Sequence, residues 1–423
     1  MRITERLYQA ITRKISSLMP AQPSHGGERE EKVRAKCAAR APGIKRYWFH
    51  GASAGELESL WTLVDQAGET GGEVWLTVFS ASGLASVERL ASDMRKAGHK
   101  LLFAGFSPRE GFWREALEMV QPDVFVTAKY EAWPELWMAL AEKDIPLVLV
   151  GARNRPSVRI AKRVCSLFAG KIPRMALLAA TEADMRSLVK LFPKAQIETS
   201  GDPRWDRVHA RAHLGHPRAK DIVAKAKWLA HPWGIMGSAW LEDLEFLGKK
   251  LTEIPGTIWV VPHHVDERTV GLIERHLQQF SQSIIRSSQS WQGISAGALK
   301  PRFIVVDEMG FLSELYSHGD WAFVGGGFGK GIHSTIEPAI QGIAVAGGAK
   351  GSHRFPEVSA LEALGQLKIL RTQSDLDRWI AVMRARNWGG REAAWSENVS
   401  KSLGASERVW KVILQAADGR LLT

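Results

Sequence analysis

The regular alternation of short apolar runs with helix-like stretches is the feature that most constrains the fold of this chain. Runs such as Val74–Phe79 have the length of buried strands, and apolar residues at helical spacing follow them. Strands that alternate with helices form parallel sheets, so the pattern predicts an α/β fold. The strand candidates form two series, which are Tyr47–His50, Val74–Phe79, Leu101–Ala104, Val124–Val126, Leu147–Val150 and Leu177–Ala180, then Gly234–Met236, Ile258–Val261, Phe303–Val306, Trp321–Val324 and Ala344–Ala346.

Two domains are predicted, because the chain has 423 residues and a single hydrophobic core stops growing at about 250–300 residues. Residues 208–232 are rich in His, Ala and Lys and contain two prolines, as expected of an interdomain linker. The first Rossmann-like domain is predicted at 40–207 and the second at 233–423, closed by a helical stretch at Arg391–Leu422. Ligands of such domains bind beyond the carboxyl ends of the strands, in a cleft between facing domains.

The charge balance predicts an anionic partner. The chain has 56 Lys and Arg against 45 Asp and Glu, a net charge of +11. The surplus is expected to be spread along the chain, without zinc-finger spacing, an aromatic RNA-binding signature or a long basic tail, which makes nucleic acid the less favoured partner. Acidic lipid and phosphorylated sugar fit better.

Cysteine content and hydropathy predict a cytoplasmic protein. Only Cys37 and Cys165 are present, which excludes a disulfide framework and a cysteine-rich metal site. No apolar run reaches the roughly 18 residues of a transmembrane helix. Residues 1–22 have the pattern of an amphipathic basic helix, which either packs on its own domain or lies in an anionic lipid interface.

A glycine-rich loop follows the strand candidate Trp321–Val324 and has the composition of a phosphate-binding loop. Closely spaced glycines let the backbone approach a ligand, and a helix start after the loop favours an anion. The loop matches neither the dinucleotide fingerprint nor the P-loop, so a single phosphate with a nucleoside is the better prediction. Candidate residues are Gly326, Gly327, Lys330, Gly331, His333, Ser334, Thr335 and Glu337; the two hydroxyls can alternatively cap the helix, and Glu337 is placed to bind a ribose.

In the first domain a carboxylate follows a strand. The run Tyr47–His50 leads through Gly51 and Ser53 to Glu56, at the expected start of a helix. Glu56 either complements the helix dipole or acts as a general base within about 3 Å of an acceptor hydroxyl.

These segments occur together with further motifs in a fixed order: Ser53–Glu56, Phe79–Gly83, Glu131–Pro134, Gly151–Arg153, Ser200–Asp206, Met236–Ser238, Val261–His264, Asp307–Gly310 and Gly325–Ala339. With them the chain resembles the transferases of 3-deoxy-D-manno-octulosonic acid (Kdo) in lipopolysaccharide synthesis. That family has the GT-B fold, in which two Rossmann-like domains face each other across a cleft.

The resemblance implies an inverting transfer of Kdo from CMP-Kdo to a lipid A precursor, with Glu56 as general base and neither a cofactor nor a metal. It also implies a peripheral enzyme at the anionic cytoplasmic face of the inner membrane. On the acceptor side it implies Ser53, Gly55, Ser80, Ser82, Glu131 and Arg153. On the donor side it adds Gly237, Ser238, His263, His264, Met309 and Gly310 to the glycine-rich loop.

Three positions depart from the family pattern and keep alternatives open. His263 stands where an Arg is usual, Lys129 where a Glu is usual, and Arg354 lies where the family has a late Asn. One alternative is a GT-B protein that uses a UDP-sugar, either a transferase or an epimerase. The other is a catalytically silent protein that binds a sugar nucleotide or a lipid.

Overall fold

The computed structural model describes residues 35, 37–129, 131–291, 300–388 and 393–421. The predicted helix at 1–22 lies outside the described residues. The chain forms two compact units, Met1–Arg207 with Ser402–Thr423 and Val208–Lys401. Among the described residues no helix is both long and apolar enough to cross a membrane.

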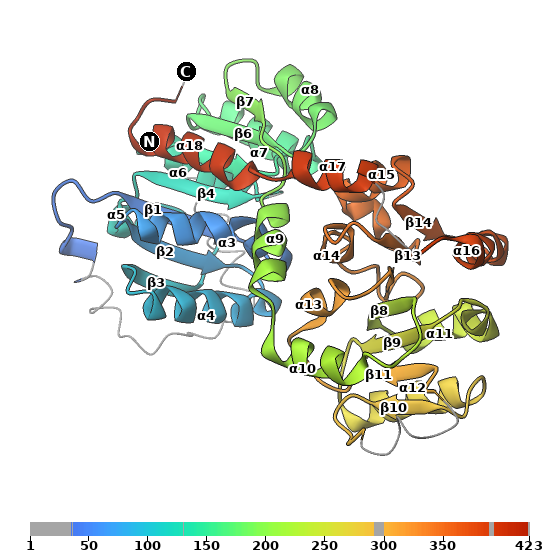
Figure 1. Ribbon diagram of the computed structural model, residues 1–423. Coiled ribbons are helices and arrows are strands. Elements are labelled where there is room, and N and C mark those ends of the chain that lie inside the picture. The colour runs from blue at the N-terminus through green and yellow to red at the C-terminus, as the bar shows by residue number, and fades with distance from the viewer. Residues whose placement is uncertain (1–34, 36, 130, 292–299, 389–392, 422–423) are drawn as a thin grey trace. The chain divides into compact units, whose positions relative to one another are not determined.

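The first unit is built on a parallel seven-stranded sheet with the strand order β3-β2-β1-β4-β5-β6-β7 (Figure 1). Its strands are β1 (Arg46–Gly51), β2 (Glu73–Val78), β3 (Leu101–Phe106), β4 (Val124–Ala128), β5 (Leu147–Val150), β6 (Met175–Ala179) and β7 (Gln196–Thr199). The helices that follow them are α3 (Ala54–Glu69), α4 (Ala81–Lys96), α5 (Trp113–Val120), α6 (Pro134–Glu142), α7 (Pro156–Phe168) and α8 (Glu182–Leu191), and α9 (Arg204–Leu214) leads out of the unit.

The second unit repeats this plan with the order β10-β11-β9-β8-β12-β13-β14. Its strands are β8 (Trp233–Ala239), β9 (Thr257–Pro262), β10 (Ile284–Arg286), β11 (Phe303–Val305), β12 (Trp321–Val324), β13 (Ala344–Gly348) and β14 (Leu367–Leu370). Its helices are α10 (Pro217–Ala226), α11 (Leu241–Leu247), η1 (Gly248–Glu253), α12 (Glu267–Gln278), α13 (Leu312–Tyr316), α14 (Ile336–Ala339), η2 (Ser352–Arg354), α15 (Pro356–Ala363), α16 (Gln373–Ala385) and α17 (Ala393–Ser402).

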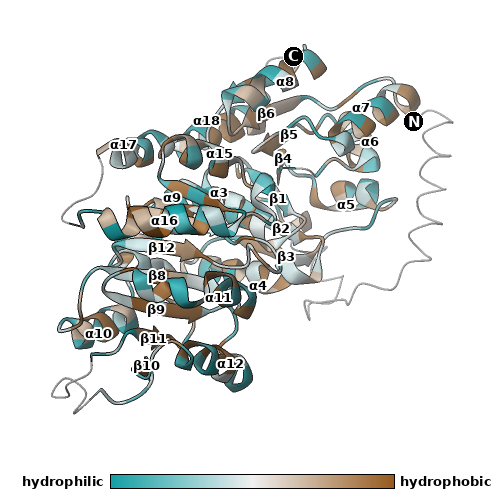
Figure 2. Ribbon diagram, turned by 90° about the vertical axis from the view of Figure 1, so that its right-hand side faces the viewer, coloured by the Kyte–Doolittle hydropathy of each residue, from teal (hydrophilic) through white to brown (hydrophobic). Residues whose placement is uncertain are grey.

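The central strands of each sheet are buried on both faces, which explains why they are largely apolar (Figure 2). In the first unit α3 and α4 cover one face, and α5 to α8 cover the other. The sequence prediction of parallel α/β domains is confirmed.

The last helix belongs to the first unit, which corrects the prediction that the C-terminal stretch closes the second domain. Helix α18 (Ala405–Ala417) packs into the core of the first sheet, where Trp410 lies 5.4 Å from the ring of Tyr47. The amides of Gly404 and Ser406 both donate to the carboxylate of Asp206, at 2.6 Å each. The apolar side chains of α18 pack against the first sheet and α3, which are distant in the sequence.

The predicted linker at 208–232 is also part of a folded unit. Within it α10 buries Ala219, Ile222 and Ala226 against the core of the second unit. The buried residues of α10 are these three only, so its apolar pattern is hard to recognise in a segment that is otherwise rich in polar side chains. The chain passes between the units twice, within α9 at Arg207–Val208 and at the end of α17 at Lys401–Ser402.

Candidate functional site

Glu56 lies in the first turn of α3, directly beyond the carboxyl end of the buried strand β1. Its carboxylate accepts hydrogen bonds from the backbone amides of Ala52 at 2.5 Å and of Ser53 at 3.2 Å. The turn between strand and helix is thereby folded back on the carboxylate, and the residue is only 6% exposed. The side chain is held in one place by its own loop.

The surroundings of Glu56 raise the pKa of its carboxyl group to about 7. Burial is the largest cause, and the nearby charge of Glu131 adds to it; the backbone hydrogen bonds and the charge of Lys129 act in the opposite direction. A carboxylate with a pKa near 7 is ionised in part at neutral pH and is a far better proton acceptor than an ordinary glutamate.

Strand β4 lies next to β1 in the sheet (Figure 1). Glu131 follows β4, so it lies at the same end of the sheet as Glu56, and it is buried. Its Oε2 accepts a hydrogen bond from Trp133 Nε1 at 2.6 Å and lies 3.4 Å from Nε2 of the buried His50. The ring of Trp133 lies 5.1 Å from Phe79, which follows β2 on the other side of β1. The loops after three adjacent strands therefore meet around Glu56.

Lys129 makes a contact at the site, although the sequence analysis treated this residue only as a departure. Its backbone is in the left-handed region with φ of 59°, and its Nζ donates to the carbonyl of Gly55 at 3.1 Å. The ammonium group is thereby held beside the turn that carries Glu56. This charge lowers the pKa of Glu56 and limits the effect of burial.

The remaining acceptor-side candidates are spread along the same edge of the sheet. Gly55 is exposed, and the hydroxyls of Ser80 and Ser82 lie 2.9 Å apart at the start of α4. Arg153, after β5, pairs with Asp184 at 3.1 Å, so part of its charge is already compensated within the protein.

The glycine-rich loop of the second unit is held by a carboxylate that the sequence analysis did not single out. Gly326 has φ of +87° and donates its amide to Asp243 Oδ2 at 2.7 Å. Asp243 is fully buried in the first turn of α11, and burial raises its pKa to about 6. A Cβ on Gly327 would lie 2.4 Å from the carbonyl oxygen of Gly348, so no larger residue fits there.

Several backbone amides of the glycine-rich loop donate hydrogen bonds to carbonyl groups of the same loop. Gly331 donates to the carbonyl of Gly326 at 2.7 Å, and His333 donates to that of Gly325 at 3.2 Å. Lys330 is exposed, Ser334 and Glu337 are half-buried, and Thr335 is fully buried. The predicted helix after the loop is present as α14, but it has only four residues.

An aromatic cluster lies beside the glycine-rich loop. His263 stacks between Trp240 at 4.7 Å and His333 at 4.5 Å, and Trp240 Nε1 lies 3.3 Å from His333 Nε2. Burial, with smaller contributions from His333 and His264, lowers the pKa of His263 to about 4. Burial also lowers the pKa of His333. His263 is therefore neutral at pH 7, where the resemblance leads one to expect a cation.

The other donor-side candidates have constrained or exposed backbones. Ser238 adopts φ of 51°, and a Cβ on Gly237 would lie 1.9 Å from the hydroxyl of the buried Tyr316. Met309 is 70% exposed, and Gly310 has φ of 105°. Both residues are exposed.

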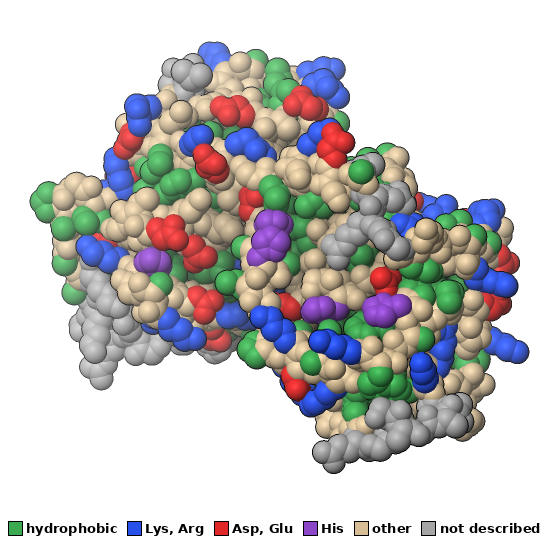
Figure 3. All heavy atoms as spheres, in the orientation of Figure 1, with side chains coloured by type: hydrophobic (Ala, Val, Ile, Leu, Met, Phe, Trp, Pro, Cys, Tyr) green, Lys and Arg blue, Asp and Glu red, His purple; other side chains and the backbone are tan. Residues whose placement is uncertain are grey.

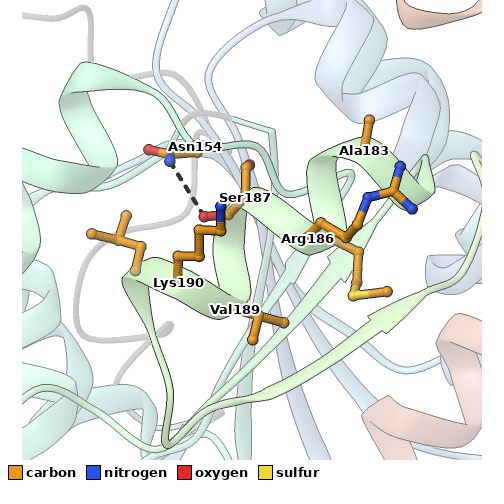
Figure 4. Close-up of a pocket in the computed structure, with 8 residues that line it drawn as sticks. Asn154, Ala183, Arg186, Ser187, Val189 and Lys190 are labelled. Carbon is orange, nitrogen blue, oxygen red and sulfur yellow. Dashed lines mark hydrogen bonds between the residues drawn. The ribbon is translucent and has the colours of Figure 1, made fainter.

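A separate cavity of about 740 Å³ lies on the first unit beside α8 (Figure 4). It is lined by Asn154, Ala183, Met185, Arg186, Ser187, Val189, Lys190 and Leu191, none of which is a site candidate from the sequence. Within the parts of the chain that the structure describes, no three His, Cys, Asp or Glu side chains are grouped as metal ligands would be.

Comparison with known proteins identifies relatives over most of the chain. Residues 23–207 match the family model described as 3-deoxy-D-manno-octulosonic-acid transferase (kdotransferase). A probable mitochondrial 3-deoxy-D-manno-octulosonic acid transferase of Arabidopsis thaliana is 25% identical, over 89% of this chain and 87% of its own length. The 3-deoxy-D-manno-octulosonic acid transferase of Bordetella pertussis is 27% identical, over 76% of this chain and 74% of its own.

Solved structures share the fold at low sequence identity. A UDP-GlcNAc 2-epimerase from Neisseria meningitidis aligns with a TM-score of 0.58 and 12% identity, over 88% of this chain and all of its own. The glycosyltransferase SnogD from Streptomyces nogalater aligns with a TM-score of 0.51 and 14% identity, over 88% and 100%. The fold is GT-B. The chain is therefore similar to Kdo transferases throughout: the family model matches the first unit, and the curated relatives extend through both units.

Proposed function

We propose that the protein transfers Kdo from CMP-Kdo to a hydroxyl of a lipid A precursor, with inversion at the anomeric carbon and Glu56 as general base. The observation that carries this proposal is the buried carboxylate of Glu56, held by its own turn and with its pKa raised to about 7. A base of this strength takes the proton from the acceptor hydroxyl as that oxygen attacks the sugar.

The second unit provides the donor side in this proposal. CMP leaves as a phosphate monoester, so catalysis requires groups that stabilise negative charge on the departing phosphate. The exposed Lys330 and the amides of Ser334 and Thr335, which have no protein acceptor among the described residues, support this role. The backbone at Met309 and Gly310 receives the cytosine, and Glu337 the ribose.

We further propose that α7 and α8 place the enzyme on an anionic membrane surface, the cytoplasmic face of the inner membrane. The sequence analysis expected the positive charge to be spread along the chain, but it is concentrated in one segment. Residues 153–194 contain ten Lys and Arg and only two Asp and Glu. Among them Arg159, Arg163, Arg186 and Lys190 are exposed and form no ion pair within the described residues. Arg186 and Lys190 line the cavity beside α8 (Figure 4). On the face drawn in Figure 3, Lys and Arg side chains are mixed with Asp and Glu side chains.

Exposed apolar side chains stand among these charges. Ile160 is 55% exposed, Leu167 74% and Val189 45%, on the outward faces of α7 and α8. Cations next to apolar residues suit the boundary between lipid headgroups and acyl chains. We call Arg155 to Leu167 around α7, together with Arg186 to Lys190 on α8, the α7–α8 surface.

Transfer from freshly generated CMP-Kdo to a purified lipid A precursor tests the proposal, with products resolved by mass. Glu56→Gln is expected to lower the rate by about 10²- to 10⁴-fold, because it removes the base but keeps the side chain's shape. Glu69→Gln, the same substitution at the exposed end of α3, is the control and keeps the wild-type rate. The same assay with EDTA tests the prediction that no metal takes part.

Other outcomes identify the alternatives. A product without Kdo, formed from a UDP-sugar, would point to a different GT-B activity. Binding of CMP-Kdo without any product would point to a silent binding protein. Full activity of Glu56→Gln would refute the assigned base.

A further inference from the structure

The side chains of Thr77, His50 and Glu131 contact one another in this order inside the first unit. We call this row the buried polar column; Thr77 and His50 have no part in the proposed mechanism. His50, in the middle of the first sheet, is fully buried among the rings of Trp113 at 5.4 Å and Phe125 at 6.2 Å. An imidazole in such surroundings is costly unless both ring nitrogens have partners. Its two nitrogens therefore define how the column is connected.

The hydroxyl of Thr77 fixes which nitrogen of His50 carries the proton. Thr77 Oγ1 accepts a hydrogen bond from Trp48 Nε1 at 2.9 Å and lies 3.0 Å from His50 Nδ1. The hydroxyl has one proton to donate, and Nδ1 is closer than its other acceptor, the carbonyl of Phe49 at 3.5 Å. With Nδ1 as acceptor, the ring proton sits on Nε2.

Nε2 of His50 faces Glu131 and no other acceptor among the described residues. It lies 3.4 Å from Glu131 Oε2, the same oxygen to which Trp133 Nε1 donates at 2.6 Å. The Trp133 N–H donates to this oxygen, while His50 Nε2 lies within ion-pair distance of it without forming a hydrogen bond. The two rings thus hold the carboxylate of Glu131 in place from two sides. The charge of Glu131 in turn is the second cause of the raised pKa of Glu56.

We propose that Thr77 and His50 are positioning residues that hold Glu131 as an oriented carboxylate, and that Glu131 in this state makes Glu56 a strong base. This inference rests on the proposed role of Glu56. The titratable groups that face the pair are Lys129, which acts against Glu131 on Glu56, and His50 itself. The backbone amides of Ala52 and Ser53 complete the surroundings of Glu56.

The pH dependence of transfer tests this inference. Activity requires ionised Glu56, so the wild-type rate is expected to fall as the pH drops through about 7. His50→Phe keeps a ring in the aromatic pocket but removes the N–H. Glu131 is then no longer held in place, its repulsion of Glu56 weakens, and the acid limb moves down by about half a pH unit. Because a weaker base accelerates the reaction less, the plateau of kcat also falls, by up to about 3-fold.

Conservative variants separate positioning from packing. His50→Gln keeps an N–H for Glu131 and is expected to restore the acid limb to its wild-type position. Thr77→Val removes only the hydroxyl that fixes the tautomer and shifts the limb in the same direction as His50→Phe, by a smaller amount. If both His50→Phe and Thr77→Val lower kcat but leave the acid limb where the wild type has it, the two residues only pack, and the inference is wrong.

A readout without substrate keeps this inference distinct from the proposed function. Introduced into the wild type, Glu56→Gln is expected to raise the free energy of unfolding, by an amount that grows with pH until the pH reaches the pKa of Glu56. Introduced into His50→Phe, the same substitution should give a stabilisation that stops growing at a pH lower by the same half unit. An unchanged end point overturns the inference even if Glu56 is the base; the expected change with an inactive enzyme supports it and refutes the proposed function alone.

Discussion

At the scale of single residues, ionised Glu56 is unfavourable to the folded state. Its pKa is about 7 in the folded protein and about 4.5 as an unperturbed side chain. The folded state therefore binds the proton more tightly, and stability is lost as the pH rises from about 4.5 through 7. Above pH 7 the uncharged Glu56→Gln should be more stable than the wild type, by up to about 3 kcal/mol. Thermal unfolding of both proteins at pH 5 and pH 8 measures the difference.

The control for this residue-scale prediction is Glu69→Gln, on the exposed end of the same helix. Its effect on the melting temperature should be small and the same at both pH values. A destabilised Glu56→Gln at pH 8 would mean that its hydrogen bonds to Ala52 and Ser53 outweigh the cost of the charge.

At the scale of elements, one carboxylate fixes the start of α18, whose apolar side chains pack into the core of the first unit. Asp206 accepts from the amides of Gly404 and Ser406, at the start of the helix. Asp206→Ala leaves both amides without this acceptor and should reduce stability by about 1–2 kcal/mol. Hydrogen exchange over residues 405–417 should become faster. Glu407→Ala, which removes an exposed ion pair with Lys411 in the same helix, is the control and should change little; equal exchange in both variants would contradict this role of Asp206.

At the scale of the whole molecule, the α7–α8 surface concentrates the positive charge. A triple variant with Arg159→Glu, Arg163→Glu and Lys190→Glu should bind vesicles containing anionic lipid at least about 100-fold more weakly, since each basic residue contributes about 1 kcal/mol near such a surface. Cosedimentation with phosphatidylglycerol vesicles measures this, and binding to purely zwitterionic vesicles should be weak for all proteins. The variant with Lys249→Glu, Arg268→Glu and Lys368→Glu has the same net charge. If it loses as much affinity, net charge rather than this surface is responsible.

The sequence alone determined the fold class and singled out the segments that we propose for both sites. Central strands of a parallel sheet are buried on both faces, so β1, β4, β8 and β12 are visible as apolar runs. The strands that the sequence analysis missed are β7, β10 and β14, all at sheet edges. An edge strand has a neighbour on one side only and carries polar residues such as Lys368, so no apolar run marks it.

The sequence also singled out Glu56 and the glycine-rich loop, because a carboxylate or a run of glycines after a strand is a local pattern. Only the tertiary structure brought His50 to Glu131 and Asp243 to Gly326, and it alone assigned α18 to the first unit. The raised pKa of Glu56 and the neutral state of His263 likewise result from burial and from neighbours distant in the chain. Local patterns are encoded within a few residues, whereas charge states and long-range contacts depend on which strands and helices the fold places side by side.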